Sequence, residues 1–479
     1  MAPLRSSIGV ELEILIGCTR EAVVGPVPPC FADSKGGPLM LPEPVDQDPT
    51  EQMKLLVEAS VLDTIRRALN EHGQRGGDYV IDESRSDSSL GPDEYHLRRY
   101  REWRVVEDST VWLTIDEQDE EEEEEEVVDM RHVRSPAFWA TDASFEEIGV
   151  VVQALADTYW ILTPPTAGLH FHYGSGKEYV PFPAVRRIAA LLYAADPVLA
   201  QLHPAHRREN NYYCRSNRQY SRLAHGYTAA LMARELEARD VEADAEVPGS
   251  LSKTTRPETP RPQYPRQPRP SHHESPHSRG PSLKVMYKRG ELTGYPALNR
   301  EQFLSTIAHE HRPLYEGVEP LDIPSAVREI LSCPNAPTAA ALMTETGMLR
   351  PAYSFKAYAA SLYRRPHMLG TQLSPYQSKR TIEFRQQAST IVAEEVVAHG
   401  RVVVGLCEFA TSAHLADIWK IVLDCAMGET HGDWYDVFDL LAETGLSKEA
   451  KVLQRSIARW RGDRIPEEFD RDDDGESHL

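Results

Sequence analysis

The sequence has few cysteines and no long apolar segment. Its six cysteines are scattered and none forms a Cys-x-x-Cys pair, so they indicate neither a disulfide framework nor a zinc finger. The longest apolar runs, near Val402–Leu406 and Ile188–Ala195, are far shorter than the ~20 residues of a membrane-spanning helix. No apolar signal region of the usual length precedes the first predicted strand. We therefore expect an intracellular protein, most simply a cytoplasmic one, without a membrane partner.

The common local motifs of nucleotide and hydrolase sites are also missing. There is no Gly-x-x-x-x-Gly-Lys-Ser/Thr phosphate loop, no Gly-x-Ser-x-Gly nucleophile elbow and no His-Glu-x-x-His helix. If the protein uses a nucleotide, a site built on a sheet must bind it.

Negative charge exceeds positive charge, but unevenly. The chain has 74 acidic and 52 basic residues, for a formal net charge of −22. Asp116–Glu126 holds ten acids and no base, and Arg461–Leu479 holds eight acids and three bases. Such an acidic block repels itself and is typical of a solvated loop. The overall acidity argues against a nucleic-acid partner.

One segment interrupts the pattern of a packed domain. Val247–Pro281 is dense in proline, serine, arginine and histidine and has almost no aliphatic residues, so it cannot bury enough apolar surface to fold. Apolar patterning resumes on both sides. We expect one domain in two parts, residues 1–246 and 282–461, with a disordered insertion at 247–281 and a disordered tail at 462–479.

Periodicity predicts the other elements. Ser144 and Glu147 form an expected capping box at the start of one helix. The other predicted helices are Lys54–Glu71, Phe182–Leu202, Tyr220–Ala238, Val392–Cys425, Trp434–Leu446 and Lys448–Arg461, with a mostly helical stretch over Arg300–Leu349. The predicted strands include Trp103–Val111, Met130–Arg134 and Leu283–Tyr287.

Three short stretches alternate apolar and charged residues as half-buried strands do, because successive side chains in a strand point to opposite faces. Charge on such a strand is costly unless it is paired or bound to an ion. The economical interpretation is therefore a single polar face that the three strands share. The pairs that would lie on it are Glu11 with Glu13, His170 with His172, and Glu383 with Arg385.

Each pair has a functional and a structural interpretation. The glutamates suit magnesium, which prefers oxygen ligands, or are simply solvated. The histidines suit a transition metal, a nucleotide or a substrate carboxylate, or form a satisfied core pair. The arginine can steady phosphoryl charge or form a structural ion pair. His132, near the acidic run, has no obvious partner in the sequence.

Taken in order, these stretches resemble the putative amidoligase family, which is related to glutamine synthetase and the carboxylate–amine ligases. The matching segments span most of residues 8–410, and the long low-complexity insertions look like those of a filamentous-fungal member. The segments are Gly9–Glu13, Trp103–Ser109, Ser135–Pro136, Gly168–Gly174, Arg208–Cys214 and Thr381–Arg385.

The resemblance implies an α+β fold like the catalytic domain of glutamine synthetase. In that fold a curved, mainly antiparallel sheet carries metal and ATP on a polar concave face and is backed by helices. ATP would phosphorylate a carboxylate, and an amine or ammonia would attack the acyl phosphate, so the implied partners are small-molecule or peptide carboxylates and amines. The implied residues are Glu11, Glu13 and Glu383 as magnesium ligands, His170 and His172 facing nucleotide or metal, Arg385 as a phosphate clamp, and Arg208 and Asp108 as further contacts in the site.

Two departures from the family pattern leave other functions open. Relatives usually carry a glutamate where this chain has His132, and often a histidine and then Gly-Thr where it has Gln387, Ser389 and Thr390. A lost carboxylate would reduce metal number or activity. The alternatives are a pseudoenzyme that binds a partner, and a zinc-dependent hydrolase built on His170, His172 and Glu11.

Overall fold

The fold was analysed in a computed structural model of the chain. It describes residues 4–19, 31, 34–41, 49–72, 77–80, 100–107, 127–208, 213–244, 283–294, 301, 320–344, 350–359, 380–466 and 469. The acidic run, the insertion predicted at 247–281 and most of the predicted tail lie outside these residues.

A large, mainly antiparallel sheet organises the described residues. Its long strands are β1 (Ser7–Thr19), β4 (Val127–Arg134), β7 (Gly168–Gly174) and β9 (Ile382–Ala388). Its short strands are β2 (Leu39–Met40), β3 (Arg104–Glu107), β5 (Phe138–Trp139), β6 (Ile161–Leu162) and β8 (Tyr353–Ser354). The main path runs β3-β4-β1-β7-β9-β8, and β2, β5 and β6 also pair with β1. Among the strands that the structure describes, β2 alone pairs in parallel, so the predicted mainly antiparallel sheet is confirmed.

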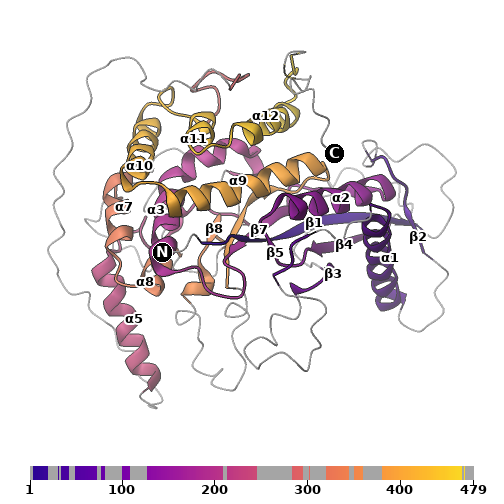
Figure 1. Cartoon of the computed structure of the whole chain (residues 1–479), viewed down its shortest axis with the longest axis horizontal. Coiled ribbons are helices and arrows are strands. Elements are labelled where there is room, and N and C mark those ends of the chain that lie inside the picture. Colours follow the sequence, from indigo (N-terminus) through magenta and orange to yellow (C-terminus); the bar gives the residue numbers. More distant parts are fainter. Residues whose placement is uncertain are drawn as a thin grey trace.

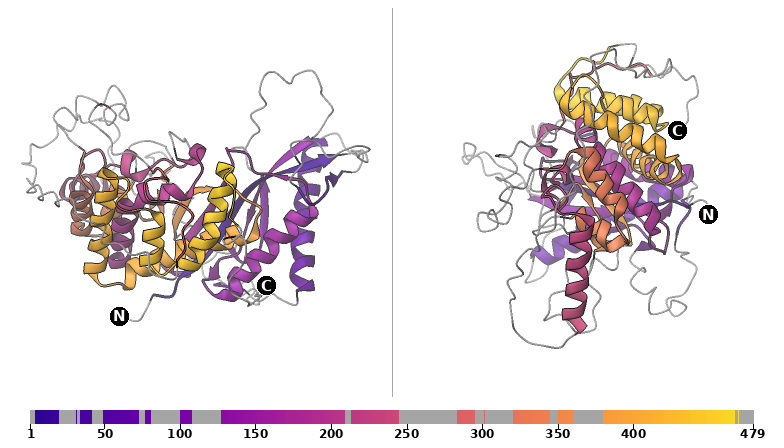
Figure 2. Two further views of the ribbon diagram at one scale, coloured as in Figure 1. Left: turned by 90° about the horizontal axis from the view of Figure 1, so that it is seen from above. Right: turned by 90° about the vertical axis from the view of Figure 1, so that its left-hand side faces the viewer.

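Helices form two layers on one side of this sheet. In Figure 1, α2 (Asp142–Thr158) and α9 (Ala393–Ser412) lie along the sheet, with α3 (Phe182–Leu199) beside α9. The helices α10 (Leu415–Thr430), α11 (Val437–Glu443) and α12 (Ser447–Arg461) pack on α3 and α9 farther out (Figures 1 and 2). The others are α1 (Pro49–Glu71), α4 (Asn217–Tyr220), α5 (Ala229–Asp244), α7 (Ile323–Ser332) and α8 (Ala336–Leu342), with 3-10 turns η4 (Ala200–Leu202), η5 (Ala205–Arg207) and η7 (Lys356–Tyr358).

The core lies between the sheet and the inner helices. Val10 and Leu12 of β1, Phe171 of β7 and Phe384 of β9 are buried there. Gly400 lets α9 approach closely, because a Cβ at this position would lie 3.0 Å from a Phe145 ring atom and 3.1 Å from one of Phe171. Since the apolar residues of each strand occupy this face, the alternating charged residues must occupy the other.

Several local predictions of secondary structure are wrong, including the helix predicted over Tyr220–Ala238, in which residues 221–228 are not helical. Residues 283–287 form no strand, because their backbone is bound by a side chain of α12: Met286 N–H donates to Gln454 Oε1 at 2.7 Å, and Gln454 Nε2 donates to the Lys284 carbonyl at 3.2 Å. Ser144 is not the cap of α2. Thr141 is, and its side chain accepts from Ser144 N–H.

Glu147, the expected partner of Ser144 in the capping box, has a different role. Its carboxylate is buried and accepts hydrogen bonds from Gly77 N–H, Tyr79 O–H and Trp103 Nε1–H, each at 2.9 Å. It thereby ties α2 to two segments that precede it. The predicted helix Val392–Cys425 is also divided, into α9 and α10.

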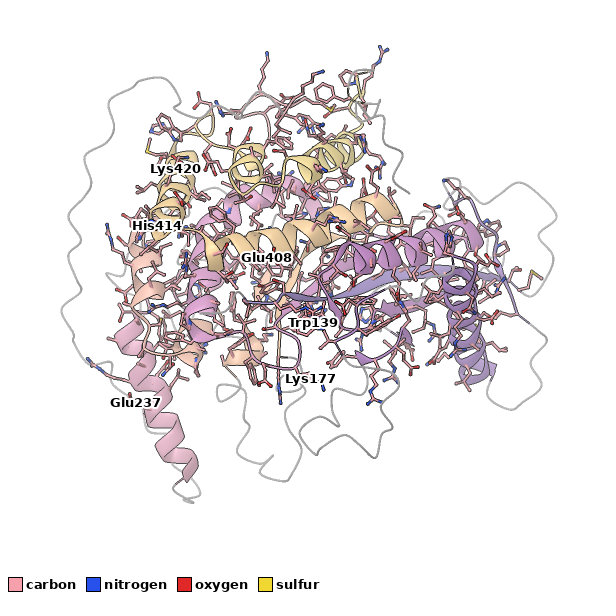
Figure 3. The ribbon with its side chains drawn as sticks, viewed as in Figure 1. Trp139, Lys177, Glu237, Glu408, His414 and Lys420 are labelled. Atoms are coloured by element: carbon pink, nitrogen blue, oxygen red, sulfur yellow. The ribbon has the colours of Figure 1, made fainter. Side chains whose placement is uncertain are left out.

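The outer helices carry exposed charge. Glu237 lies on α5, which projects away from the sheet, and Lys420 lies on α10 (Figure 3). Among the helices that the structure describes, none is both long enough and apolar enough to cross a membrane.

Two buried histidines stack between α9 and the end of α3. The rings of His203 and His399 are 5.7 Å apart at their centroids and inclined by 25°. Neither Nδ1 atom has a hydrogen-bond partner among the described residues. Burial lowers the pKa of His399 to about 4 and lowers that of His203 well below its ordinary value. Both rings are therefore neutral in the fold at neutral pH.

This pair predicts a loss of stability in mild acid. Below pH ~6.5 these histidines become protonated in the unfolded chain, whereas the buried rings of the folded protein stay neutral. The free energy of unfolding therefore falls as the pH falls from about 6.5 toward 4, by ~1.4 kcal/mol per pH unit for each such histidine. We expect His399→Gln to reduce this slope in urea unfolding measured between pH 7 and 5. The exposed His72 gives the control variant His72→Gln, and equal slopes in all three proteins would contradict the prediction.

Candidate active site

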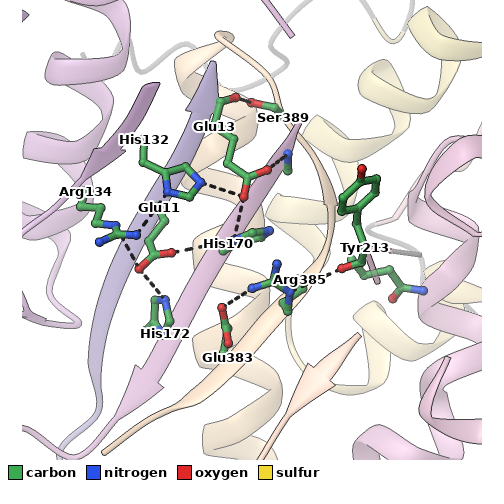
Figure 4. Close-up of polar contacts among 12 residues, drawn as sticks. Glu11, Glu13, His132, Arg134, His170, His172, Tyr213, Glu383, Arg385 and Ser389 are labelled. Atoms are coloured by element: carbon green, nitrogen blue, oxygen red, sulfur yellow. Dashed lines mark hydrogen bonds and ion pairs between the residues drawn. The ribbon is translucent and has the colours of Figure 1, made fainter. Parts of the chain in front are cut away.

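Three neighbouring strands place the predicted polar residues on one face. In the antiparallel pair β1–β7, Glu11 lies opposite His170, and in the pair β7–β9, His172 lies opposite Glu383. Figure 4 shows these side chains standing in front of the sheet, with the helices behind it. The predicted shared polar face is therefore confirmed, although β9 follows β7 by about two hundred residues.

A compact group of three potential metal ligands lies at the centre of this face. One ligand atom from each of Glu11, His172 and Glu383 lies within 4.8 Å of the others. His172 Nε2 is 3.2 Å from Glu11 Oε1 without hydrogen-bond geometry. Its Nδ1 is 3.2 Å from Thr381 Oγ1, which holds the ring so that Nε2 points toward the two carboxylates.

Glu13 has different surroundings. Its Oε2 accepts a 2.6 Å hydrogen bond from Gly168 N–H, and its Oε1 lies 2.9 Å from His132 Nε2 and 3.4 Å from His170 Nδ1. Burial alone would raise the pKa of Glu13, but His170, His132 and Arg385 outweigh it and lower the pKa to about 2. Burial, assisted by Arg385, lowers the pKa of His170. Glu13 is therefore ionised at neutral pH and held by donors of the protein, while His170 is neutral.

His132 and Arg134 of β4 belong to the same site, and sequence reasoning missed both roles. β4 pairs with β1 so that His132 lies opposite Glu13 and Arg134 opposite Glu11. Arg134 Nη2 lies 3.2 Å from His132 Nδ1, and its Nε lies 3.5 Å from Glu11 Oε1. Because a guanidinium can only donate, Nδ1 must accept and Nε2 must carry the proton given to Glu13. His132 is therefore a neutral relay between Arg134 and Glu13.

Arg385 lies on the other side of the group. Its Nη1 donates to Glu383 Oε1 at 2.5 Å and its Nε to the Tyr213 carbonyl at 3.4 Å. The nearby carboxylates of Glu383, Glu13 and Glu11 raise its pKa despite burial. The fully buried Arg207 side chain donates to the backbone carbonyl of Arg385 at 2.7 Å. The arginine that supports β9 is thus Arg207.

The other predicted residues lie elsewhere or cannot be placed. Arg208, one residue further on, donates to the Thr293 carbonyl. Asp108 lies outside the described residues. Of the positions that depart from the family pattern, Ser389 donates to the Glu13 carbonyl at 2.6 Å and Thr390 donates to Glu395 at 2.8 Å. The Ser389 hydroxyl therefore binds the backbone of β1, and the Thr390 hydroxyl binds a side chain at the start of α9.

The central group fits a divalent cation. Its donor set is two carboxylates and one imidazole, which suits magnesium, manganese or zinc. The side chains of Glu11 and His172 are only 8% and 11% exposed, and the buried His172 Nε2 has no hydrogen-bond partner within the described residues. A cation between these atoms would offset the close approach of the buried Glu11 carboxylate and the partly buried Glu383 carboxylate.

Sequence comparison matches part of the chain to a protein family. The sequence model of a family described as putative amidoligase enzyme matches residues 5–238. No curated protein and no solved structure matches the chain, so the glutamine synthetase-like fold and the fungal origin stay predictions. The match contains the site residues of β1, β4 and β7 but ends before Glu383 and Arg385 of β9. Residues 5–238 of this chain are thus similar in sequence to the putative amidoligase family, whose description indicates a ligase-type enzyme.

Proposed function

We propose that this protein is an ATP- and magnesium-dependent ligase that joins a carboxylate to an amine or ammonia. The observation that carries the proposal is the group of Glu11, His172 and Glu383 with Arg385 beside it. A cation site next to a buried guanidinium suits a triphosphate, because both neutralise phosphate oxygens. The match of residues 5–238 to the putative amidoligase family supports the amide-forming half of the reaction.

The reaction would proceed in two steps. A carboxylate oxygen of the substrate attacks the γ-phosphorus of ATP, so that an acyl phosphate forms and ADP leaves. The amine nitrogen then attacks the acyl carbon, the C–O bond to phosphate breaks, and the nitrogen loses a proton. Such phosphoryl transfer depends mainly on positioning and on neutralising charge.

The residues of the chain have distinct roles in this proposal. Glu11, His172 and Glu383 would hold magnesium, which would neutralise phosphate charge when bound. The Arg385 guanidinium would steady the transferred phosphoryl group, since its planar fork matches two oxygens at once. His170, neutral and 2% exposed, lies between Glu11 and Glu13 and can hydrogen-bond without adding charge. Arg134 would balance Glu11 from the β4 side.

Calorimetry of ATP binding tests the proposal. We expect wild-type protein to bind ATP only with magnesium, and Glu11→Gln to weaken this binding at least about a hundredfold, or ~2.7 kcal/mol. Glu146→Gln, at an exposed position on α2, is the matched control and should bind like wild type. A panel of carboxylates with ammonia or amines, screened for ADP release, would then identify substrates.

The outcomes separate the alternatives. Folded wild-type protein that binds no ATP would overturn the ligase proposal. Zinc binding with chelator-sensitive hydrolysis that ATP does not affect would then indicate a hydrolase. If neither nucleotide nor metal binds, a pseudoenzyme that binds a partner becomes the better interpretation.

A further inference from the structure

The two carboxylates of β1 face the same side of the sheet but have unequal surroundings. Glu11 lies beside His172 and Glu383, which can complete a coordination sphere. Glu13 lies two residues further along β1, between Gly168, His132 and His170. Two carboxylates two residues apart would ordinarily be assigned the same role, so the difference in their partners is informative.

The donors around Glu13 leave it poorly available as a metal ligand. The Gly168 N–H belongs to the backbone of β7 and cannot turn away from Oε2. Oε1 accepts the Nε2–H of His132, whose Nδ1 in turn accepts from Arg134. A cation at Glu13 would have to lie close to the positive ends of these donors or displace them, and each buried N–H left unsatisfied costs about 1–3 kcal/mol.

Opposite charge is also already supplied at Glu13. The Arg134 guanidinium reaches it through the His132 relay, and Arg385 approaches from β9. A second divalent ion would bring positive charge to a carboxylate that these groups already compensate. Glu11 and Glu383 also have arginine partners, Arg134 at 3.5 Å and Arg385 at 2.5 Å. What distinguishes them from Glu13 is the nearby His172 Nε2, which has no hydrogen-bond partner among the described residues.

We propose that the polar face holds one divalent ion, bound by Glu11, His172 and Glu383, and that the Arg134–His132 relay and the Gly168 amide keep Glu13 out of its coordination sphere. This inference rests on the proposed function, because the ion is the one that the ligase would use. Glu13 is then a positioning residue that holds the ends of β7 and β4 against β1.

Manganese titration of the full chain without nucleotide, followed by the electron paramagnetic resonance signal of free Mn²⁺, tests the inference. Wild type should bind one Mn²⁺ per chain. Glu13→Gln should still bind one Mn²⁺, with affinity reduced by less than about tenfold. Loss of a residue that only supports a metal ligand typically weakens metal affinity by ~10–100-fold, and Glu11→Gln should weaken Mn²⁺ affinity by more than this. Two ions in wild type, or loss of the ion in Glu13→Gln, would overturn the inference.

The relay residue gives a second, constructive test. His132→Glu would place a carboxylate opposite Glu13 in the β1–β4 register and remove the donor, so this variant should bind two Mn²⁺. His132→Gln keeps an N–H donor without adding charge and should still bind one. A folded His132→Glu protein that binds one ion would contradict the role given to the relay.

These results can be separated from those on the ligase activity. One Mn²⁺ per chain without any ATP binding would refute the ligase and leave the one-ion site standing. ATP binding by a wild-type protein that binds two Mn²⁺ ions would refute the one-ion site and leave the ligase proposal standing.

Discussion

A single methyl group added at Gly168 is expected to disable the site. The Cβ of Gly168→Ala would lie 2.6 Å from His170 Nε2 and 2.8 Å from Arg207 Nη2. Both atoms end side chains that are almost completely buried, at 2% and 0% exposure, so neither can move into solvent. We expect the free energy of unfolding to fall by about 1–3 kcal/mol and magnesium-dependent ATP binding to weaken by tenfold or more, roughly 1.4 kcal/mol. Urea unfolding and calorimetry measure the two effects.

Gly9 provides the matched control for Gly168. It lies on the adjacent strand β1, and its added Cβ would meet nothing closer than 3.8 Å, at His172 Cβ. Gly9→Ala should therefore change stability by no more than about 1 kcal/mol, with a gain possible because alanine restricts the unfolded chain. If both variants behaved alike, the close packing of His170 and Arg207 around Gly168 would not be what makes that position sensitive.

Replacing Arg385 by lysine is expected to slow the reaction far more than it weakens ATP binding. The guanidinium already donates to Glu383 and to the Tyr213 carbonyl, and its planar fork leaves further N–H groups for phosphoryl oxygens. An ammonium keeps the charge but not this geometry. We expect ADP release, measured with a carboxylate found in the substrate screen, to fall by about 10²–10³-fold, as when one preorganised donor is removed from a transition state.

The exposed Arg67, paired with Asp63 on α1, supplies the control Arg67→Lys. This variant should release ADP at the wild-type rate. An Arg385→Lys protein within about threefold of wild type would show that charge alone suffices at this position, and the role of a phosphate clamp would then pass to another residue.

Alternation along the chain was enough to predict the polar face. The pairs at Glu11, His170 and Glu383 each repeat at two residues, and a half-buried strand has only two faces on which to place them. The helices at Lys54–Glu71, Phe182–Leu202 and Lys448–Arg461 were also predicted close to their observed bounds, since each carries apolar residues at helical spacing.

The contributions of β4 and of Arg207 could not be predicted in the same way. His132 and Arg134 repeat at two residues as well, but their partners depend on the register between β1 and β4, which are more than a hundred residues apart. That register is set by tertiary packing. Arg207 and Arg208 are adjacent residues at the end of a 3-10 turn. Nothing in the local sequence indicates which of the two side chains binds the backbone of β9. The capping box predicted at Ser144 does not form, because the Glu147 carboxylate instead accepts hydrogen bonds from Gly77, Tyr79 and Trp103.

The position of β9 in the chain has a consequence for synthesis. β1, β4 and β7 leave the ribosome long before Glu383 and Arg385 are translated. The helices α2 and α3 are also made before β9, but the covering helix α9 follows it. Until then one long edge of β7 has unpaired backbone groups, which is the kind of edge that recruits strands from other chains. A nascent or prematurely terminated chain would therefore present two thirds of a cation site without being able to close it. Binding of the ion would therefore indicate that the chain has been synthesised at least through β9.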